Sequence, residues 1–330
     1  MNIWFLLTVF ASFLLSAVFV PLLIPVLKKL KAGQNEREEG NPEHKKKQGT
    51  PVMGALAFLP AIVIASVAFS LIASDAELAK WLPVLCLTIG FGIVGFLDDF
   101  LKIKKKKNEG LKVWQKLALQ FVMASAFTLY CYFTPDVGTK TILPFSGGKE
   151  WDIGLFYIPF ALVVILGTDN GTNFTDGVDG LLSSVTVVAA LFLSFASMKL
   201  GGSVTYVGGA VAGALMGFLL SNAYKAKVFM GDTGSLAIGG FVAGSALVMK
   251  MGWFILLFGL IYVIEVVSVI LQVGFFKITH GKRLFKMAPI HHHFELGGWK
   301  ETKVVTVFTL ASFVFCLAGL GLWFLGKGGM

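Results

Sequence analysis

Three aspartates are the side chains of this sequence best suited to chemistry, because each lies at the edge of a strongly apolar segment. Asp98 and Asp99 follow one such segment, and Asp232 lies in a glycine-rich turn before another. Mg²⁺ is typically held by one or two carboxylates, while water and substrate phosphate complete its coordination. The three aspartates therefore indicate a magnesium site that binds a diphosphate. An isolated Asp-Asp pair would more simply be interpreted as a hydrated helix end.

The composition indicates that a membrane protein positions these aspartates. Of the 330 residues, 56% are hydrophobic and 14% are charged, whereas soluble proteins carry about 25% charged residues. A transmembrane helix requires roughly 20 apolar residues. The sequence predicts a single domain, residues 1–330, that is an all-α polytopic membrane protein with ten transmembrane helices near 3–27, 51–74, 82–100, 114–134, 153–169, 182–198, 204–222, 235–251, 254–276 and 304–325.

The distribution of Lys and Arg predicts the orientation of these helices. Ten spans place 22 of the 28 Lys and Arg residues in the loops of one side, at 28–50, 101–116, 222–234 and 277–303. Cytoplasmic loops are enriched in these residues, so both termini are predicted to face outward. The three aspartates, the polar run 169–179 and the histidine run 291–293 then share the cytoplasmic face. This convergence favours an active site there.

Several other polar or aromatic residues are candidates for substrate contacts on that face. Lys116, at the mouth of the fourth span, is placed to hold a phosphate as a point charge, and Lys47 is a second such lysine. Phe229 either faces lipid or stacks on a nucleotide base, which is worth ~1 to 3 kcal/mol. The net charge of +9 is explained by basic loops that face anionic lipids, so no nucleic-acid partner is expected.

The histidine run and one buried acid leave alternatives open. His291, His292 and His293 are adjacent, so a helix cannot direct all three at one metal ion. We interpret them as phosphate contacts, because histidine donates hydrogen bonds and titrates near neutral pH. Glu265, in the middle of the predicted ninth span, is costly in hydrocarbon. It is either a functional residue or a protonated group hydrogen-bonded between helices.

Three features carry structural rather than chemical predictions. The three cysteines, at 86, 131 and 316, show no metal or disulfide spacing and are predicted to be small core residues. Proline and glycine in the outer loop 134–152 predict a turn or short hairpin. The small-residue runs 208–210 and 239–240 permit close helix contacts, including those of a homodimer.

Six motifs are spread over the chain: Gly49-Thr50-Pro51-Val52-Met53-Gly54, Gly95-Phe96-Leu97-Asp98-Asp99-Phe100, Gln115-Lys116-Leu117, Asn173-Phe174-Thr175-Asp176-Gly177-Val178-Asp179-Gly180-Leu181, Val228-Phe229-Met230-Gly231-Asp232-Thr233-Gly234-Ser235-Leu236 and Pro289-Ile290-His291-His292-His293-Phe294-Glu295. The aspartate motifs resemble those of the polyprenyl-phosphate N-acetylhexosamine-1-phosphate transferase superfamily. The histidine triplet with Phe-Glu resembles its phospho-N-acetylmuramoyl-pentapeptide transferase family in particular. The resemblance implies ten transmembrane helices in the bacterial inner (cytoplasmic) membrane.

The resemblance also implies a reaction. Phospho-N-acetylmuramoyl-pentapeptide passes from its UDP-linked donor to undecaprenyl phosphate with Mg²⁺ as cofactor, which gives lipid I and UMP. This reaction belongs to peptidoglycan synthesis and so to cell wall biogenesis, cell shape and cell division. The family's pattern falls on the paired catalytic aspartates Asp98 and Asp99, the magnesium ligand Asp232, the catalytic-pocket residues Lys116, Asn173, Asp176 and His292, and the nucleoside-recognition residues Lys47, Asp179, Asn222 and Phe229. His291 and His293 are further substrate-binding candidates.

The sequence departs from the family's pattern in places that affect loops rather than ionisable groups. Val52 and Ala55 stand where the family usually has Thr and Gly, and Lys225 replaces a common proline. Asp98 or Asp99 could act as a base for direct attack by the lipid phosphate or as a nucleophile, and we favour direct attack with Asp98 as the base. Two alternatives are a transferase of the same superfamily that uses UDP-N-acetylglucosamine, and a non-catalytic transporter, whose charges would line the middle of the bilayer.

Overall fold

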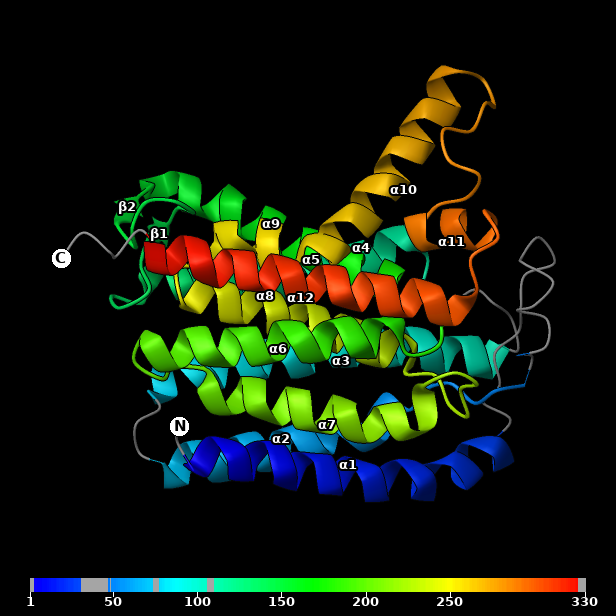
Figure 1. Cartoon of the computed structure of the whole chain (residues 1–330), viewed down its shortest axis with the longest axis horizontal. Coiled ribbons are helices and arrows are strands. Elements are labelled where there is room, and N and C mark those ends of the chain that lie inside the picture. Colours follow the sequence, from blue (N-terminus) through cyan, green and yellow to red (C-terminus); the bar gives the residue numbers. More distant parts are fainter. Residues whose placement is uncertain (1–2, 31–46, 48, 74–76, 106–109, 326–330) are drawn as a thin grey trace.

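The protein is a bundle of long helices with one small hairpin (Figure 1). The computed structural model describes residues 3–30, 47, 49–73, 77–105 and 110–325. The elements are α1 (Ile3–Lys29), α2 (Ala55–Ile72), α3 (Leu78–Lys105), α4 (Val113–Phe133), β1 (Lys140–Ile142), β2 (Glu150–Asp152), η2 (Gly154–Phe156), α5 (Tyr157–Thr175), α6 (Leu181–Lys199), α7 (Thr205–Asn222), α8 (Gly231–Val248), η3 (Gly252–Phe254), α9 (Ile255–Phe258), α10 (Leu260–Ile278), α11 (Ile290–Glu295) and α12 (Glu301–Leu325).

The prediction of an all-α polytopic membrane protein is confirmed. Within the described residues, nine helices are long and apolar enough to cross a membrane. Helix α8 has 18 residues and occupies the position of the predicted eighth span, but it is not one of the nine. Its sequence is rich in glycine and serine and contains Asp232 in its first turn, which lowers its mean hydropathy. The structure therefore supports nine of the ten predicted spans by length and composition.

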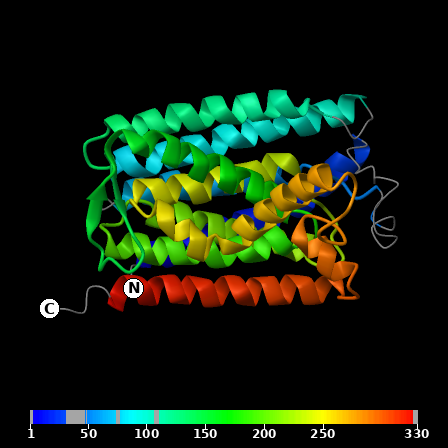
Figure 2. The same cartoon turned by 90° about the horizontal axis from the view of Figure 1, so that it is seen from above.

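Helix α8 is the buried centre of the bundle. Every residue from Thr233 to Val248 is buried, and α8 lies against α3 and α5 (Figure 2). Small side chains at such positions let helix backbones approach closely, which stabilises membrane bundles through van der Waals contact. The surface of α8 is thus covered by its own chain, so its start can hold a side chain away from lipid.

The small-residue runs that suggested a homodimer lie inside the monomer. A Cβ atom on Gly208 would lie 2.2 Å from the Ser194 hydroxyl, and one on Gly240 would lie 2.8 Å from the Phe91 ring. Helices of the same chain therefore occupy both runs. These runs give no ground for a dimer.

The predicted ninth span, residues 254–276, is broken into η3, α9 and α10. The break falls at Gly259, and glycine in a helix interior is ~1 kcal/mol less favourable than alanine. Beyond it, α10 diverges from the direction of the other helices (Figure 1). The hydropathy of this segment is continuous, which is why the sequence predicted a single helix.

The loop at 134–152 contains the predicted hairpin. Strands β1 and β2 are antiparallel, with Thr141 opposite Trp151, and the Ile142 N–H donates to the Lys250 carbonyl beyond α8 at 2.7 Å. The first residues of α1, the last residues of α12 and the hairpin lie at one end of the bundle, whereas α11 lies at the other (Figure 1). This separation of the hairpin from the histidine helix agrees with the predicted arrangement of loops.

The cysteine prediction is correct for two of the three residues. All three are free thiols; Cys131 and Cys316 are buried, but Cys86 is exposed. Cys86 lies on the outward face of α3, where a small apolar side chain is equally suited to lipid. Periodicity within an all-apolar helix does not distinguish these two faces.

Candidate active site

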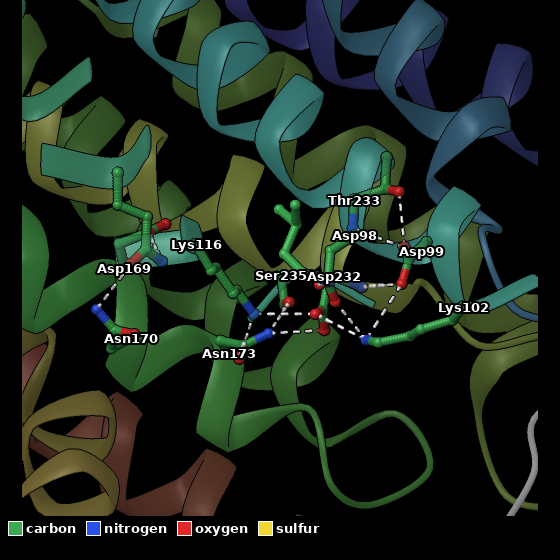
Figure 3. A network of polar contacts seen from close by, with 12 residues as sticks. Asp98, Asp99, Lys102, Lys116, Asp169, Asn170, Asn173, Asp232, Thr233 and Ser235 are labelled. Carbon is green, nitrogen blue, oxygen red and sulfur yellow. Dashed lines mark hydrogen bonds and ion pairs between the residues drawn. The ribbon is translucent and has the colours of Figure 1, made fainter. Parts of the chain in front are cut away.

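Asp232 is the centre of a polar network at the start of α8 (Figure 3). Its Oδ2 atom lies 2.9 Å from Lys116 Nζ and 2.9 Å from Lys102 Nζ. Its Oδ1 atom accepts a hydrogen bond of 3.0 Å from the Asn173 side-chain amide. Helices α3, α4 and α5 each supply one of these partners, so the four helices converge on a single carboxylate.

Asp99 anchors the first turn of α8 to α3. Its Oδ2 atom accepts hydrogen bonds from the Thr233 N–H at 2.9 Å and the Thr233 hydroxyl at 2.7 Å. Its Oδ1 atom accepts from the Asp232 N–H at 3.2 Å. The first N–H groups of a helix have no partner within it and carry partial positive charge. The buried Asp99 carboxylate satisfies them and so fixes Asp232 in place.

Asp98 faces different partners from those of its neighbour. Its Oδ1 atom accepts from the Leu111 N–H at 2.7 Å, and its Oδ2 atom lies 2.6 Å from Lys102 Nζ. Carboxylate oxygens of Asp98, Asp99 and Asp232 all lie within 4.8 Å of one another. The sequence-based prediction that these three aspartates meet is borne out by this geometry.

Lys102 is a further site residue, beyond those predicted from the sequence. Besides Asp98 and Asp232, it lies 3.7 Å from Asp99 Oδ1, so one ammonium contacts all three carboxylates. The signal was present, because residues three and four positions apart share a helix face. Lys102 follows the aspartate pair by these intervals, but the adjacent run of lysines made it resemble a positive-inside determinant.

The approach of α3 to α8 requires glycine at two positions. A Cβ atom on Gly95 would lie 2.1 Å from the Asp232 carbonyl oxygen and 2.6 Å from the Thr233 nitrogen. Gly231 has a φ of 74°, and a Cβ there would lie 2.5 Å from Asp99 Oδ2. Neither of these two clashes can be relieved unless the start of α8 moves.

Gly95→Ala is therefore expected to lower both the melting temperature and the activity, because overpacking against backbone costs about 1–3 kcal/mol. Gly90→Ala on the same helix is the matched control, since its Cβ would lie 2.1 Å from the flexible end of Met123. Thermal melting in detergent compares the two. Equal losses in both variants would contradict the claim that the α3–α8 contact is tight.

Lys116 and Asn173 extend the network, and a second polar layer lies one helical turn deeper. Lys116 Nζ donates to Asn173 Oδ1 at 3.2 Å, and Asn173 also donates to the Ser235 hydroxyl at 2.8 Å. In the deeper layer the Gln120 amide donates to the buried carboxylate of Asp169 at 2.7 Å. The two layers tie α4 to α5 and hold Lys116 toward Asp232.

Lys47 and Asp179 form a second cluster together with Glu301. Lys47 Nζ lies 2.7 Å from Asp179 Oδ1 and also contacts Glu301. The Asp179 N–H donates to Glu301 Oε1 at 2.7 Å. Burial alone would lower the pKa of Lys47, but the hydrogen bonds and charges of the two carboxylates raise it above its usual value. Glu301, the first residue of α12, was not singled out from the sequence, where it reads as an ordinary helix start.

Asp176 directly follows α5. In the sequence it lies between Asn173, which belongs to the first cluster, and Asp179, which belongs to the second. Burial raises the pKa of its carboxyl well above the usual range, and the charges of Asp232, Asp99 and Asp179 raise it further. Asp176 therefore belongs electrostatically to both clusters.

Asn222 and Phe229 lie on the α7–α8 connection. Asn222 is buried, accepts from the Ser183 hydroxyl at 3.0 Å and donates to the Val228 carbonyl at 3.1 Å. Phe229 is half-buried, and its backbone pairs with Pro51 and Gly54 at 2.9 and 2.8 Å. Asn222 thus supports the loop that presents Phe229.

The histidines occupy three different environments at α11. His291 is fully buried, with Nδ1 3.1 Å from Glu265 Oε1. His292 Nδ1 lies 2.7 Å from Glu295 Oε2, and His293 Nδ1 accepts from the Lys286 N–H at 3.1 Å. The prediction that three adjacent histidines do not face one point is therefore correct.

Comparison with known proteins gives consistent results over most of the chain. A family model described as glycosyl transferase family 4 matches residues 81–250. The chain is 50% identical over 306 residues to a phospho-N-acetylmuramoyl-pentapeptide-transferase of Clostridium perfringens (strain 13 / Type A), covering 92% of this chain and 94% of that protein. Proteins of the same name from Clostridium novyi (strain NT) and Clostridium botulinum (strain Alaska E43 / Type E3) are 45% and 47% identical, covering 94% and 93% of each chain respectively.

Proposed function

Because the chain belongs to the phospho-N-acetylmuramoyl-pentapeptide-transferase family, we propose that it transfers phospho-N-acetylmuramoyl-pentapeptide from its UDP-linked donor to undecaprenyl phosphate. The products are lipid I, a peptidoglycan precursor, and UMP. The observation that carries this proposal is the meeting of Asp98, Asp99 and Asp232 with Lys102 and Lys116. Ammonium groups beside carboxylates that can hold Mg²⁺ are suited to neutralising a diphosphate during transfer.

We also propose that the site lies at the cytoplasmic face of the bacterial inner membrane, with both termini outside. Both ends of the described chain lie at the same end of the bundle (Figure 1), which requires an even number of crossings. Nine candidate spans together with α8 give ten. The last turns of α1 and α3, which carry Lys28, Lys29, Lys102, Lys104 and Lys105, lie at the opposite end together with α11 (Figure 1), and cytoplasmic loops are rich in Lys and Arg.

Mg²⁺ is the proposed cofactor because the donor set fits it. Three carboxylates offer oxygen atoms within 4.8 Å of one another, and Mg²⁺ prefers such oxygen ligands with substrate phosphate completing its shell. Asp232 would hold the ion, together with Asp98 or Asp99. When bound, Mg²⁺ would offset the charge of the diphosphate and so make UMP a better leaving group.

Side chains of the protein neutralise charge, accept the proton and position the other groups of the site. Lys116 is fixed by Asn173 and Asp232 and neutralises charge on the leaving phosphate. Asp98 accepts the proton of the lipid phosphate, whose oxygen then attacks the sugar-linked phosphorus as the bond to UMP breaks. Asp99 keeps the start of α8 in place, because its oxygens are occupied by the first turn of that helix.

The second cluster is proposed to bind the uridine end of the donor. Lys47 and Asp179 offer a cation and a carboxylate side by side, and the Ala226 N–H donates to Asp179 Oδ2 at 2.9 Å. That bond joins the cluster to the loop that carries Phe229, whose ring can stack on uracil. Glu301 orients both Lys47 and Asp179.

The purified protein tests this proposal in a two-donor assay. UMP release is expected with UDP-N-acetylmuramoyl-pentapeptide and undecaprenyl phosphate together, and it should stop when either the lipid or Mg²⁺ is withheld. Faster release from UDP-N-acetylglucosamine would move the chain to the other branch of the superfamily. Absence of lipid-dependent UMP release from both donors would leave the transporter alternative.

A further inference from the structure

Glu265 and His291 form an ionisable pair in the interior of the protein, apart from the carboxylate cluster. Both side chains have 0% exposure, and Nδ1 of His291 lies 3.1 Å from Oε1 of Glu265. Apart from this contact, neither Glu265 oxygen and neither His291 ring nitrogen has a hydrogen-bond partner in the described chain. An acid within a membrane helix is costly unless paired. The contact between the two groups therefore offsets part of the cost of burying each of them.

The imidazole of His291 is held on two further sides. Its ring centroid lies 4.1 Å from that of His292. Its Nε2 atom faces Gly177, where a Cβ would lie 2.3 Å from that nitrogen. Gly177 lies four residues after Asn173, whose side-chain amide donates to Asp232 Oδ1 at 3.0 Å. His291 thus lies between α10 and the turn that borders the aspartate cluster.

Helix α10 carries a second anchor for the same segment. The Gln272 side chain accepts hydrogen bonds from the N–H groups of Leu284 and Phe285 at 3.1 and 2.9 Å. Gln272 fixes the loop before α11, and Glu265 fixes α11 itself. The six-residue helix α11 is therefore positioned from α10, which diverges from the rest of the bundle (Figure 1).

We propose that Glu265 is a positioning residue that acts through His291: it fixes α11 against the Gly177 turn and so sets the place of His292, the histidine that the family resemblance assigns to the catalytic pocket. The Glu265 carboxylate holds the His291 imidazole, and the absence of a side chain at Gly177 leaves room for that ring. Since His292 touches the His291 ring, a displaced His291 displaces His292. This inference rests on the proposed transferase activity.

Glu265→Gln is the first test, because it keeps the side-chain volume but removes the carboxylate that lies beside His291 Nδ1. We expect kcat to fall about tenfold or more, a size typical for groups that orient a functional histidine, with KM for both substrates and the melting temperature near wild type. Hydrogen exchange in residues 290–295 should become faster. Ser268→Ala is the matched control, because Ser268 is a buried residue of the same helix whose hydroxyl donates to the Glu265 carbonyl, and it should retain kcat.

Gly177→Ala in both backgrounds is the second test. In the wild type, the new Cβ would collide with a ring that Glu265 holds in place, so kcat should fall. In Glu265→Gln the ring can turn away, so the second substitution should add little, and non-additivity of this kind reports contact within one unit.

Two results would overturn the inference: unchanged kcat in Glu265→Gln, or losses that multiply in the double variant. A lowered melting temperature in both Glu265→Gln and Glu265→Asp would identify Glu265 as a packing residue instead. Wild-type protein in the same assay separates the two proposals. Inactive wild type defeats the proposed function, whereas active wild type with a fully active Glu265→Gln defeats only the role of Glu265.

Discussion

Asp232→Asn is expected to reduce UMP release by at least about 10²-fold, the loss typical when one electrostatic contact to a developing charge is removed. Asp232 is the carboxylate on which Lys102, Lys116 and Asn173 converge. Asparagine keeps the shape but removes the charge that holds both ammonium groups and the proposed metal ion. The measurement is lipid-dependent UMP release at saturating Mg²⁺, together with Mn²⁺ binding followed by electron paramagnetic resonance.

The variant should nevertheless fold. In the wild type, Lys102 contacts all three carboxylates of the cluster, whereas Lys116 contacts Asp232. In Asp232→Asn, Lys102 keeps its contacts with Asp98 and Asp99, and the partly exposed Lys116 keeps its hydrogen bond to Asn173 Oδ1. We therefore expect a melting temperature near that of the wild type, and loss of metal binding without loss of structure.

Asp152→Asn provides the matched control for this substitution. Asp152 is an exposed carboxylate of β2, at the end of the bundle away from α11, and it accepts from the Gly154 N–H at 2.9 Å. The same chemical change there should leave transfer intact. Robust Mg²⁺-dependent activity in Asp232→Asn would remove Asp232 from the metal site and leave Asp98 and Asp99 as the remaining candidates.

The sequence predicted the members of the aspartate cluster because topology brings them together. Once the basic loops were assigned to one side, Asp98, Asp99 and Asp232 had to lie at the same end of the bundle. The hairpin at 134–152 followed from proline and glycine in the same way. These predictions depend on which end of a helix a residue occupies, and hydropathy and charge report that well.

Other features depend on the direction of individual side chains and on contacts between segments far apart in the sequence. Hydropathy reports neither of these. Lys102 was hidden in a lysine run, although helical spacing directs it to the aspartates. Glu301 is the first residue of α12, and its partners Lys47 and Asp179 come from loops far away in the sequence. The residues around Glu301 therefore do not indicate these contacts. The break at Gly259 also lay within a continuous apolar stretch. Each of these features required the tertiary contacts.

Asp98→Asn and Asp99→Asn are expected to separate two roles that the sequence left interchangeable. Asp99 accepts three hydrogen bonds, and two of their donors are backbone N–H groups of α8. An amide would direct its own N–H groups at one of these donors, so Asp99→Asn should lose about 1–2 kcal/mol of stability, as removal of a helix cap does. At Asp98 the group facing the new amide would be the flexible end of Lys102, which can turn toward Asp99 and Asp232.

Both variants should therefore lose transfer, but thermal melting should fall in Asp99→Asn and stay near wild type in Asp98→Asn. The same pair of proteins tests direct attack. Wild type incubated with donor labelled in the sugar-linked phosphate, without lipid acceptor, should retain no label after denaturation, because Asp98 then has no proton to take and forms no bond to phosphorus. Label retained by the wild type and by Asp99→Asn, but lost in Asp98→Asn, would instead make Asp98 the nucleophile of a two-step reaction. In that case the Lys102 contact to Asp98 would have to open before the first bond forms, and the same labelling experiment on Lys102→Ala would show faster incorporation.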